Sequence, residues 1–280
     1  MSSKRTCQGM SQMKLTRREL LAVLSSGLTS FATPSLTAQV STRDVPEAAT
    51  LMAGDFLWPK RPGTIVPYTS RPGEATEADR NRWVNDRIRE LRRLSSVSSP
   101  TESEKERFRI LSALSYEEFM RLYLDDEDPK SPSPFGSIAP FSVGHVAIVE
   151  SRGGEPWIIE AMPDSGVRTL SYANWLKSRS GELVWHARLQ EIQSERRESI
   201  VSFAKQNVGK AYDFWNFDLL DDAGFYCSKL AWYAVWRATS VALDDRPDPK
   251  RALWYSPKQM LRSKRLALLS SPRSYALGRP

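Results

Sequence analysis

The chain has 280 residues, of which 40% are hydrophobic, so it is long enough to bury a sizeable core within one domain. Its formal net charge is +7, but the first 32 residues hold five basic residues against one acidic residue. Residues 33–280 therefore carry a net charge of only +3, from 35 basic and 32 acidic residues. This small excess removes the charge argument for nucleic-acid binding, and we expect no nucleic-acid partner.

The N-terminus has the pattern of a secretory signal. The adjacent Arg17 and Arg18 precede a modest apolar stretch, residues 22–32, and then further small residues. This order is typical of a signal peptide of the twin-arginine type, and the stretch is too short and too rich in serine to span a membrane. We therefore predict a leader over residues 1–38 and export to the periplasm or the cell exterior. The alternative is a disordered N-terminal tail.

Residues 39–269 are expected to form the folded domain, which begins with strands at Gly54–Trp58 and Thr64–Tyr68. The pattern then changes, because residues 77–94 and the region after Thr101 carry apolar side chains at helical spacing. We interpret residues 74–134 as an inserted group of two or three amphipathic helices. This insertion either covers the sheet or forms a lid that selects the substrate.

Two local signals in the insertion can be interpreted separately. Thr101-Glu-Ser-Glu104 is a capping box, which predicts the start of a helix. Residues 125–134 are acidic and then rich in proline. Because this stretch lacks the spacing of an EF-hand, we interpret it as a solvated loop and not as a calcium site.

One of the two histidines, His145, lies in a β-branched apolar run, Phe141–Val149, that predicts a strand. A turn centred on Gly153-Gly154 separates this run from a second one, so the two runs predict an antiparallel hairpin. In that register Met162 pairs with His145, and Glu160 lies one diagonal step away on the same face. A slip of one residue would move Glu160 to the opposite face.

The rest of the chain alternates between short strand and helix patterns. Strands are predicted at 167–170 and 183–189, and helices at 172–177, 195–208 and 227–239, with a last short helix opened by Ser256-Pro257 and a loose tail at 270–280. Ser194 is the expected cap of the helix at 195–208. The second histidine, His186, lies in a predicted strand, where it faces solvent or packs on the sheet; a role as catalytic base is the less favoured alternative.

Cys227 is the second of only two cysteines, and it stands at the start of a predicted helix. Peptide dipoles at a helix N-terminus favour the thiolate, which is the nucleophile of acyl-transfer chemistry. The other cysteine, Cys7, lies in the predicted leader, so Cys227 would be left unpaired after export. The alternative is that Cys227 is a small residue of the core.

Five short motifs follow one another in the order of a known family: Gly54-Asp55, Gly144-His145, Glu160-Ala161 with Gly166-Val167, Ser171–Leu176, and Gly209–Tyr212 with Tyr226–Leu230. The last of these resembles the core of the NlpC-type cell-wall peptidases. Because His145 and Glu160 precede Cys227 here, the order resembles the circularly permuted papain-like amidases, the YiiX-like group. The resemblance covers residues 51–265 apart from the insertion.

This resemblance implies an α+β, permuted papain-like (NlpC-type) fold, in which an antiparallel sheet packs against helices that include the cysteine-bearing one. It implies Cys227 as the nucleophile, His145 as the base and Glu160 as the residue that orients the base. Tyr212 and Tyr226 would bind the substrate or the oxyanion. A core position is the alternative for Tyr212.

We therefore expect an exported cysteine hydrolase that cleaves an amide bond in cell-wall peptide or a lipidated amine through an acyl-enzyme. A lipid acyltransferase or thioesterase with the same triad, and a non-catalytic binding module, are the alternatives. No cofactor and no metal is expected, because one cysteine and two separated histidines lack the spacing of zinc ligands. The expected partner is a peptide, lipid or small-molecule substrate, with contact to the cell wall or a membrane surface, and the oligomeric state is left open.

Overall fold

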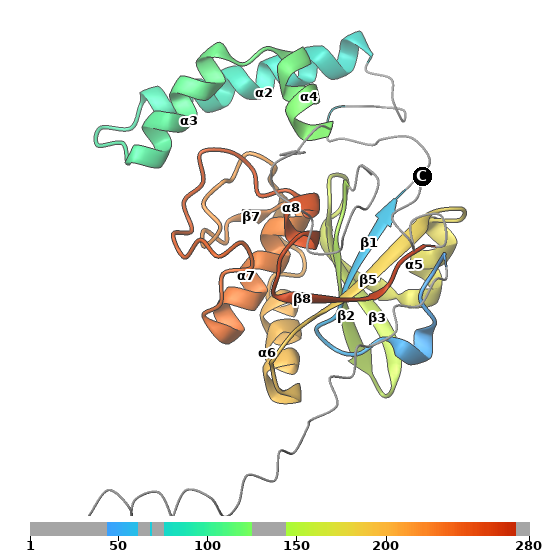
Figure 1. Cartoon of the computed structure of the whole chain (residues 1–280). Coiled ribbons are helices and arrows are strands. Elements are labelled where there is room, and N and C mark those ends of the chain that lie inside the picture. The colour runs from blue at the N-terminus through green and yellow to red at the C-terminus, as the bar shows by residue number, and fades with distance from the viewer. Residues whose placement is uncertain (1–43, 61–67, 69–75, 125–143, 273–280) are drawn as a thin grey trace, which may run out of the picture. The chain divides into compact units, whose positions relative to one another are not determined.

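The computed structural model describes residues 44–60, 68, 76–124 and 144–272 (Figure 1). All of them belong to one compact unit, residues 39–280. The predicted leader, the acidic stretch at 125–134, most of the predicted strand at Thr64–Tyr68 and most of the predicted tail lie outside the described residues.

Within the described residues the main sheet has six strands in the order β4-β3-β2-β1-β5-β8, and all neighbours are antiparallel. These strands are β1 (Phe56–Lys60), β2 (Ala147–Arg152), β3 (Glu155–Met162), β4 (Gly166–Ser171), β5 (Leu183–Leu189) and β8 (Leu266–Ser270). A separate parallel pair consists of β6 (Ala211–Tyr212) and β7 (Gly224–Phe225). The helices are η1 (Ala48–Thr50), α2 (Glu77–Ser95), α3 (Glu102–Ala113), α4 (Tyr116–Leu124), α5 (Tyr172–Ser178), α6 (Ser194–Lys205), α7 (Cys227–Thr239) and α8 (Pro257–Leu261). This is the expected α+β fold.

The hairpin of β2 and β3 has the register that its two glycines predict. Gly153 and Gly154 have φ angles of 58° and 87°, the left-handed conformation that a two-residue hairpin turn requires. Arg152 and Glu155 pair directly across this turn. One boundary was wrong: β2 begins two residues after His145, so the histidine precedes the strand and does not lie within it.

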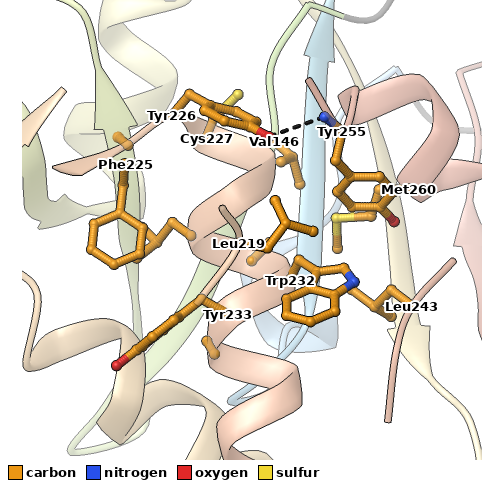
Figure 2. Packing of buried hydrophobic residues seen from close by; sticks show 14 of the residues in the cluster. Val146, Leu219, Phe225, Tyr226, Cys227, Trp232, Tyr233, Leu243, Tyr255 and Met260 are labelled. Carbon is orange, nitrogen blue, oxygen red and sulfur yellow. Dashed lines mark hydrogen bonds between the residues drawn. The ribbon is translucent and has the colours of Figure 1, made fainter. Parts of the chain in front are cut away.

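Both faces of the sheet are covered. Phe56 and Trp58 of β1 point into a large core that includes residues of α6 and α7, whereas Leu57 between them points into a smaller core that includes residues of α5. Successive strand residues point to opposite faces, so a strand buried on both sides is apolar along its whole length. Figure 1 shows α6 and α7 on one side of the sheet and α5 on the other. Figure 2 shows the large core around α7, where Trp232 packs with buried neighbours.

The insertion consists of three helices in its described part. Thr76 and Thr101 form capping boxes at the starts of α2 and α3, as predicted for Thr101. The ring of Phe119 in α4 lies 5.5 Å from Trp83 of α2 and 5.2 Å from Trp254. The apolar side of the insertion therefore belongs to the large core. Among the described helices, none is both long and apolar enough to cross a membrane.

Gly166 at the start of β4 joins the main sheet to the chain that leads to α7. Its φ is +64°, and a Cβ atom there would lie 2.2 Å from the carbonyl oxygen of Lys210. The next residue, Val167, donates its N–H to that same oxygen at 2.9 Å. Only glycine fits so close an approach of two backbones, which explains the glycine of the Gly166-Val167 motif.

Two local predictions differ from the structure, and a third is confirmed in one of its two forms. Helix α6 begins at Ser194, so Gln193 and not Ser194 is its N-cap, and the helix ends at Lys205 instead of Val208. Strand β8 was not predicted, and it takes up Ser270 at the start of the expected tail. Of the two placements predicted for His186, the structure shows the one packed on the sheet: His186 is 1% exposed, and its Nε2 lies 2.7 Å from a carboxylate oxygen of Asp55.

Candidate active site

Cys227 is the first residue of α7, directly after the N-cap Tyr226. Its thiol is buried and lies 4.0 Å from the carbonyl oxygen of Gly144. The backbone N–H groups of Val146 and Ser228 both donate to the sulfur. The start of α7 therefore lies against the chain that enters β2, and that chain carries His145.

His145 and Glu160 are hydrogen-bonded, with 2.8 Å between the imidazole Nε2 and the carboxylate Oε2. The His145 side chain is 14% exposed, and that of Glu160 is fully buried. The contact follows from the hairpin register, which places Glu160 one diagonal step from the position of His145. The structure therefore brings together the histidine and the acid that the sequence paired.

The carboxylate of Glu160 is held by three further side chains. Its Oε2 also accepts from Trp175 Nε1 at 2.9 Å and from Arg179 Nη2 at 2.9 Å. Its Oε1 accepts from Nε and Nη2 of Arg168 at 3.0 and 2.7 Å. Burial alone raises the pKa of this carboxyl group, but His145, Arg179 and Arg168 outweigh it and hold the pKa well below the usual range. Glu160 is thus a permanent anion at neutral pH.

Cys227 and His145 shift each other's protonation. Burial raises the pKa of the Cys227 thiol, but its hydrogen bond to His145 and the charge of the imidazolium lower the pKa below the ordinary value. Burial likewise lowers the pKa of His145, and here the hydrogen bonds to Cys227 and Glu160 prevail and raise it. The two shifts together favour a thiolate beside an imidazolium, which is the reactive form of a cysteine nucleophile.

The three residues reach the site from different sides of the sheet. Ile158 in β3 points into the core with α5, and Glu160, two positions on, shares that face with Trp175 of α5. Cys227 belongs to the large core on the other face. His145, which lies ahead of β2, contacts both of them. The histidine therefore links the thiol on one face to the carboxylate on the other.

The sequence also proposed two tyrosines, Tyr212 and Tyr226, as residues that bind the substrate or the oxyanion. Tyr226 is 2% exposed, and its hydroxyl oxygen accepts a hydrogen bond from the N–H of Tyr255 at 3.0 Å (Figure 2). Its ring thus packs in the core. Tyr212 lines a cavity of about 720 Å³ between α2, α3 and the segment 211–223. Cys227, His145 and Glu160 are not among the residues that line this cavity.

Sequence reasoning missed the residues that hold Glu160. The position of Arg168 could have been predicted, because it lies in the predicted strand at 167–170 and pairs directly with Glu160 of β3. The positions of Trp175 and Arg179 could not, since their approach depends on how α5 packs on the sheet. Asp55 was noted only as part of the Gly-Asp motif, and its partner His186 comes from a strand far along the chain.

A comparison with protein families matches residues 129–269, half of the chain, to the permuted papain-like amidase enzymes of the YaeF/YiiX, C92 family. The chain belongs to this family. It is therefore a cysteine amidase or peptidase-type hydrolase with a permuted papain-like fold, as the order of its motifs indicated.

Comparisons with individual proteins add less. No curated protein matches the chain. Among solved structures, the chain is similar to metalloprotein yiiX from Escherichia coli O157:H7, with 18% identity and a TM-score of 0.39 over 46% of this chain and 83% of that one. Within the described part of this C92 family member, no group of three or more histidine, cysteine, aspartate or glutamate residues is arranged to hold a metal ion.

Proposed function

We propose that this C92 family member is an exported cysteine hydrolase that cleaves an amide bond through Cys227, His145 and Glu160. The observation that carries the proposal is the contact of His145 with both the thiol and the buried carboxylate. In a nucleophile–base–acid series, the base must reach the nucleophile and must itself be oriented by a third group. His145 meets both conditions.

The first half of the reaction forms an acyl-enzyme. The thiol proton of Cys227 passes to His145, and the thiolate attacks the carbonyl carbon of the amide. The Cys227 N–H lies at the first position of α7, where a backbone donor has no acceptor within the helix, so it is free to bind the developing oxyanion. The imidazolium then gives its proton to the leaving nitrogen. The C–N bond breaks, an amine departs, and the acyl group remains on sulfur as a thioester.

The second half restores the enzyme. His145, now neutral, takes a proton from water as the oxygen attacks the thioester carbon. The C–S bond breaks, a carboxylic acid leaves, and the proton returns to the pair of Cys227 and His145. Glu160 acts in both halves, because its hydrogen bond fixes the tautomer and orientation of the ring and stabilises the imidazolium.

The proposed substrate is cell-wall peptide or a lipidated amine, and the proposed location is the periplasm or the cell exterior. Support for export comes from the signal pattern of residues 1–38, with its paired arginines. Support for an amide comes from the family, whose members are described as amidases. The tryptophans do not favour a lipid acyltransferase over an amidase: Trp58, Trp175 and Trp232 are fully buried in the core, and Trp157, Trp215, Trp236 and Trp254 are half-buried.

The test is a product assay on the full chain carrying Cys7→Ser, so that Cys227 is its only thiol. The protein is incubated with cell-wall peptides and, separately, with an N-acyl amine, and released amine and acid are measured. We expect release from one of the two classes and its loss in Cys227→Ser. Release that persists in Cys227→Ser, or transfer of the acyl group to a lipid acceptor instead of water, would contradict the proposal.

A further inference from the structure

The two oxygens of the Glu160 carboxylate have different neighbours. Oε1 is held by Arg168 of β4, whose side chain is 37% exposed. Oε2, the oxygen that bonds to His145, is held from α5 by Trp175 and by Arg179, the residue that directly follows this helix. The oxygen that orients the base is therefore the one that α5 controls.

Trp175 and Arg179 form a rigid pair. Trp175 is fully buried, and the Arg179 side chain is 8% exposed. The guanidinium carbon of Arg179 lies 4.9 Å from the centre of the Trp175 ring, and its Nη1 lies 3.3 Å from the Glu182 carboxylate. A guanidinium that is stacked on one side and paired at its other end has little rotational freedom. Its hydrogen bond to Oε2 therefore has a fixed direction.

We propose that Trp175 and Arg179 are positioning residues of this active site: they lock the Glu160 carboxylate in the one orientation that turns the His145 ring towards Cys227, and the charge of Arg179 sets the pH range over which His145 works. The proposal rests on the function proposed above for Cys227 and His145. It assigns to α5, on the face of the sheet opposite α7, control over the base.

The locking follows from the directions of the hydrogen bonds. A carboxylate that bonds only to the histidine can rotate and carry the ring with it. Here Oε2 is hydrogen-bonded to Trp175 and Arg179 as well as to His145. Arg168 restrains the other oxygen, Oε1. A base that is held within about 0.5 Å of its reactive position needs such support, because small misplacements cost large factors in rate.

The charge effect has a definite sign. Burial lowers the pKa of the His145 imidazole, Cys227 from α7 and Glu160 from β3 raise it, and the charge of Arg179 lowers it. Arg168 faces Glu160 from β4, and Glu182 faces Arg179. Without Arg179, the imidazolium loses a repulsive neighbour and faces a less shielded carboxylate. The variant Arg179→Gln should therefore keep His145 protonated to higher pH.

The chain holds only two histidines, so NMR of the ring nitrogens follows His145 directly, with His186 as the internal comparison. We expect the titration of His145 to move to higher pH in Arg179→Gln and to return in Arg179→Lys, which restores the charge. We expect kcat/KM to fall about tenfold in Arg179→Gln, with only partial recovery in Arg179→Lys, because lysine lacks the planar fork of arginine.

The matched control is Arg152→Gln, which removes one of two cations from another buried glutamate, Glu150, in the same sheet. It should leave the His145 titration unchanged. If Arg179→Gln does not fold, Arg168→Gln makes a smaller change of the same sign at a more exposed position. The proposal is overturned if the His145 titration is unmoved in the folded arginine variants of this cluster, or if it moves as far in Arg152→Gln.

The same measurement separates this inference from the function on which it rests. The ring titration needs no substrate and no turnover. If Cys227→Ser leaves amide cleavage unchanged, the proposed function fails, whereas the position of the His145 titration in Arg179→Gln still decides whether α5 controls the base.

Discussion

The described residues form two clusters of histidine, carboxylate and arginine, and one of these clusters contacts the described thiol, Cys227. In the first, His145 Nε2 lies 2.8 Å from Glu160, which also binds arginines. In the second, His186 Nε2 lies 2.7 Å from Asp55, which accepts two hydrogen bonds from Arg188 at 2.6 and 2.8 Å. Both carboxylates are fully buried. By hydrogen bonding alone the clusters are nearly equivalent.

The two histidines differ in their position relative to the strands and in their exposure to solvent. His186 lies within β5 and its side chain is 2% exposed, so its ring is enclosed by the sheet. His145 lies ahead of β2, with 14% of its side chain exposed, beside the only described cysteine. A histidine–acid pair therefore has two uses in this fold. The His186–Asp55 pair ties the start of β1 to β5, whereas His145, ahead of β2, lies beside the thiol of Cys227.

Replacing each histidine in turn by asparagine gives the strongest test of this difference. His145→Asn should lower kcat/KM by about 10³-fold or more, because it removes the base from the thiol. His186→Asn should leave kcat/KM within a few-fold and lower the free energy of unfolding by about 1–3 kcal/mol, because it leaves a buried oxygen of Asp55 short of a donor. Steady-state kinetics and urea unfolding measure both. Equal losses of activity in the two variants would remove the distinction.

The acids provide the next comparison. Glu160→Gln should lower kcat/KM by about 10²–10⁴-fold, since a glutamine cannot stabilise the imidazolium. It should also destabilise the fold by about 1.5–3 kcal/mol, because the buried guanidinium of Arg179 loses a charged hydrogen bond and keeps only Glu182 as an anionic partner. Asp55→Asn should show a loss of stability of the same order with activity retained in the folded fraction. An active Glu160→Gln enzyme would exclude Glu160 as the orienting acid.

A smaller effect is expected at Arg188. Its side chain is 20% exposed, and it pairs with Asp55 through Nε. Arg188→Gln should cost about 1–2 kcal/mol in the free energy of unfolding, the size of a partly exposed charged hydrogen bond. The kcat and KM of the variant should match those of the parent. A changed pH profile of kcat/KM in this variant would mean that the second cluster is coupled to the active site.

The smallest effect concerns acid stability. The pKa of Asp55 is lowered, since Arg188 and His186 outweigh burial, which acts to raise it. A lowered pKa in the folded state stabilises the protein above the unfolded pKa of about 4, and this contribution is lost as the pH falls through the folded value. The difference in unfolding free energy between the parent and Asp55→Asn should thus be constant from pH 7 to 5 and shrink below pH 4. A difference that grows on acidification would contradict this sign.

The sequence allowed the contacts of Cys227, His145 and Glu160 to be predicted because their signals are local. Gly153 and Gly154 determine the hairpin turn, the turn determines the register, and the register brings Glu160 to His145. The apolar periodicity after Tyr226 likewise predicted α7 at its observed bounds. Each step needed only neighbouring residues and the geometry of a strand or a helix.

What the sequence did not reveal depends on packing between distant segments. The approach of Arg179 to Glu160 requires α5 to lie on one particular face of the sheet. The burial of His186 requires Asp55 to be carried beside β5 by β1. Strand β8 is a short apolar run after a helix, and only its pairing with β5 makes it a strand. Local sequence propensity does not predict the position of Arg179, the burial of His186 or strand β8, because the stabilising contacts are tertiary.

The central claim is that His145 activates Cys227. The direct measurement is the rate of alkylation of Cys227 by iodoacetamide against pH, followed by mass spectrometry in the Cys7→Ser background. We predict a thiolate at pH values below the ordinary thiol pKa of about 8.5, and a return to ordinary behaviour in His145→Asn but not in His186→Asn. A rate that follows the ordinary thiol pKa in the parent and does not change in His145→Asn would contradict the account.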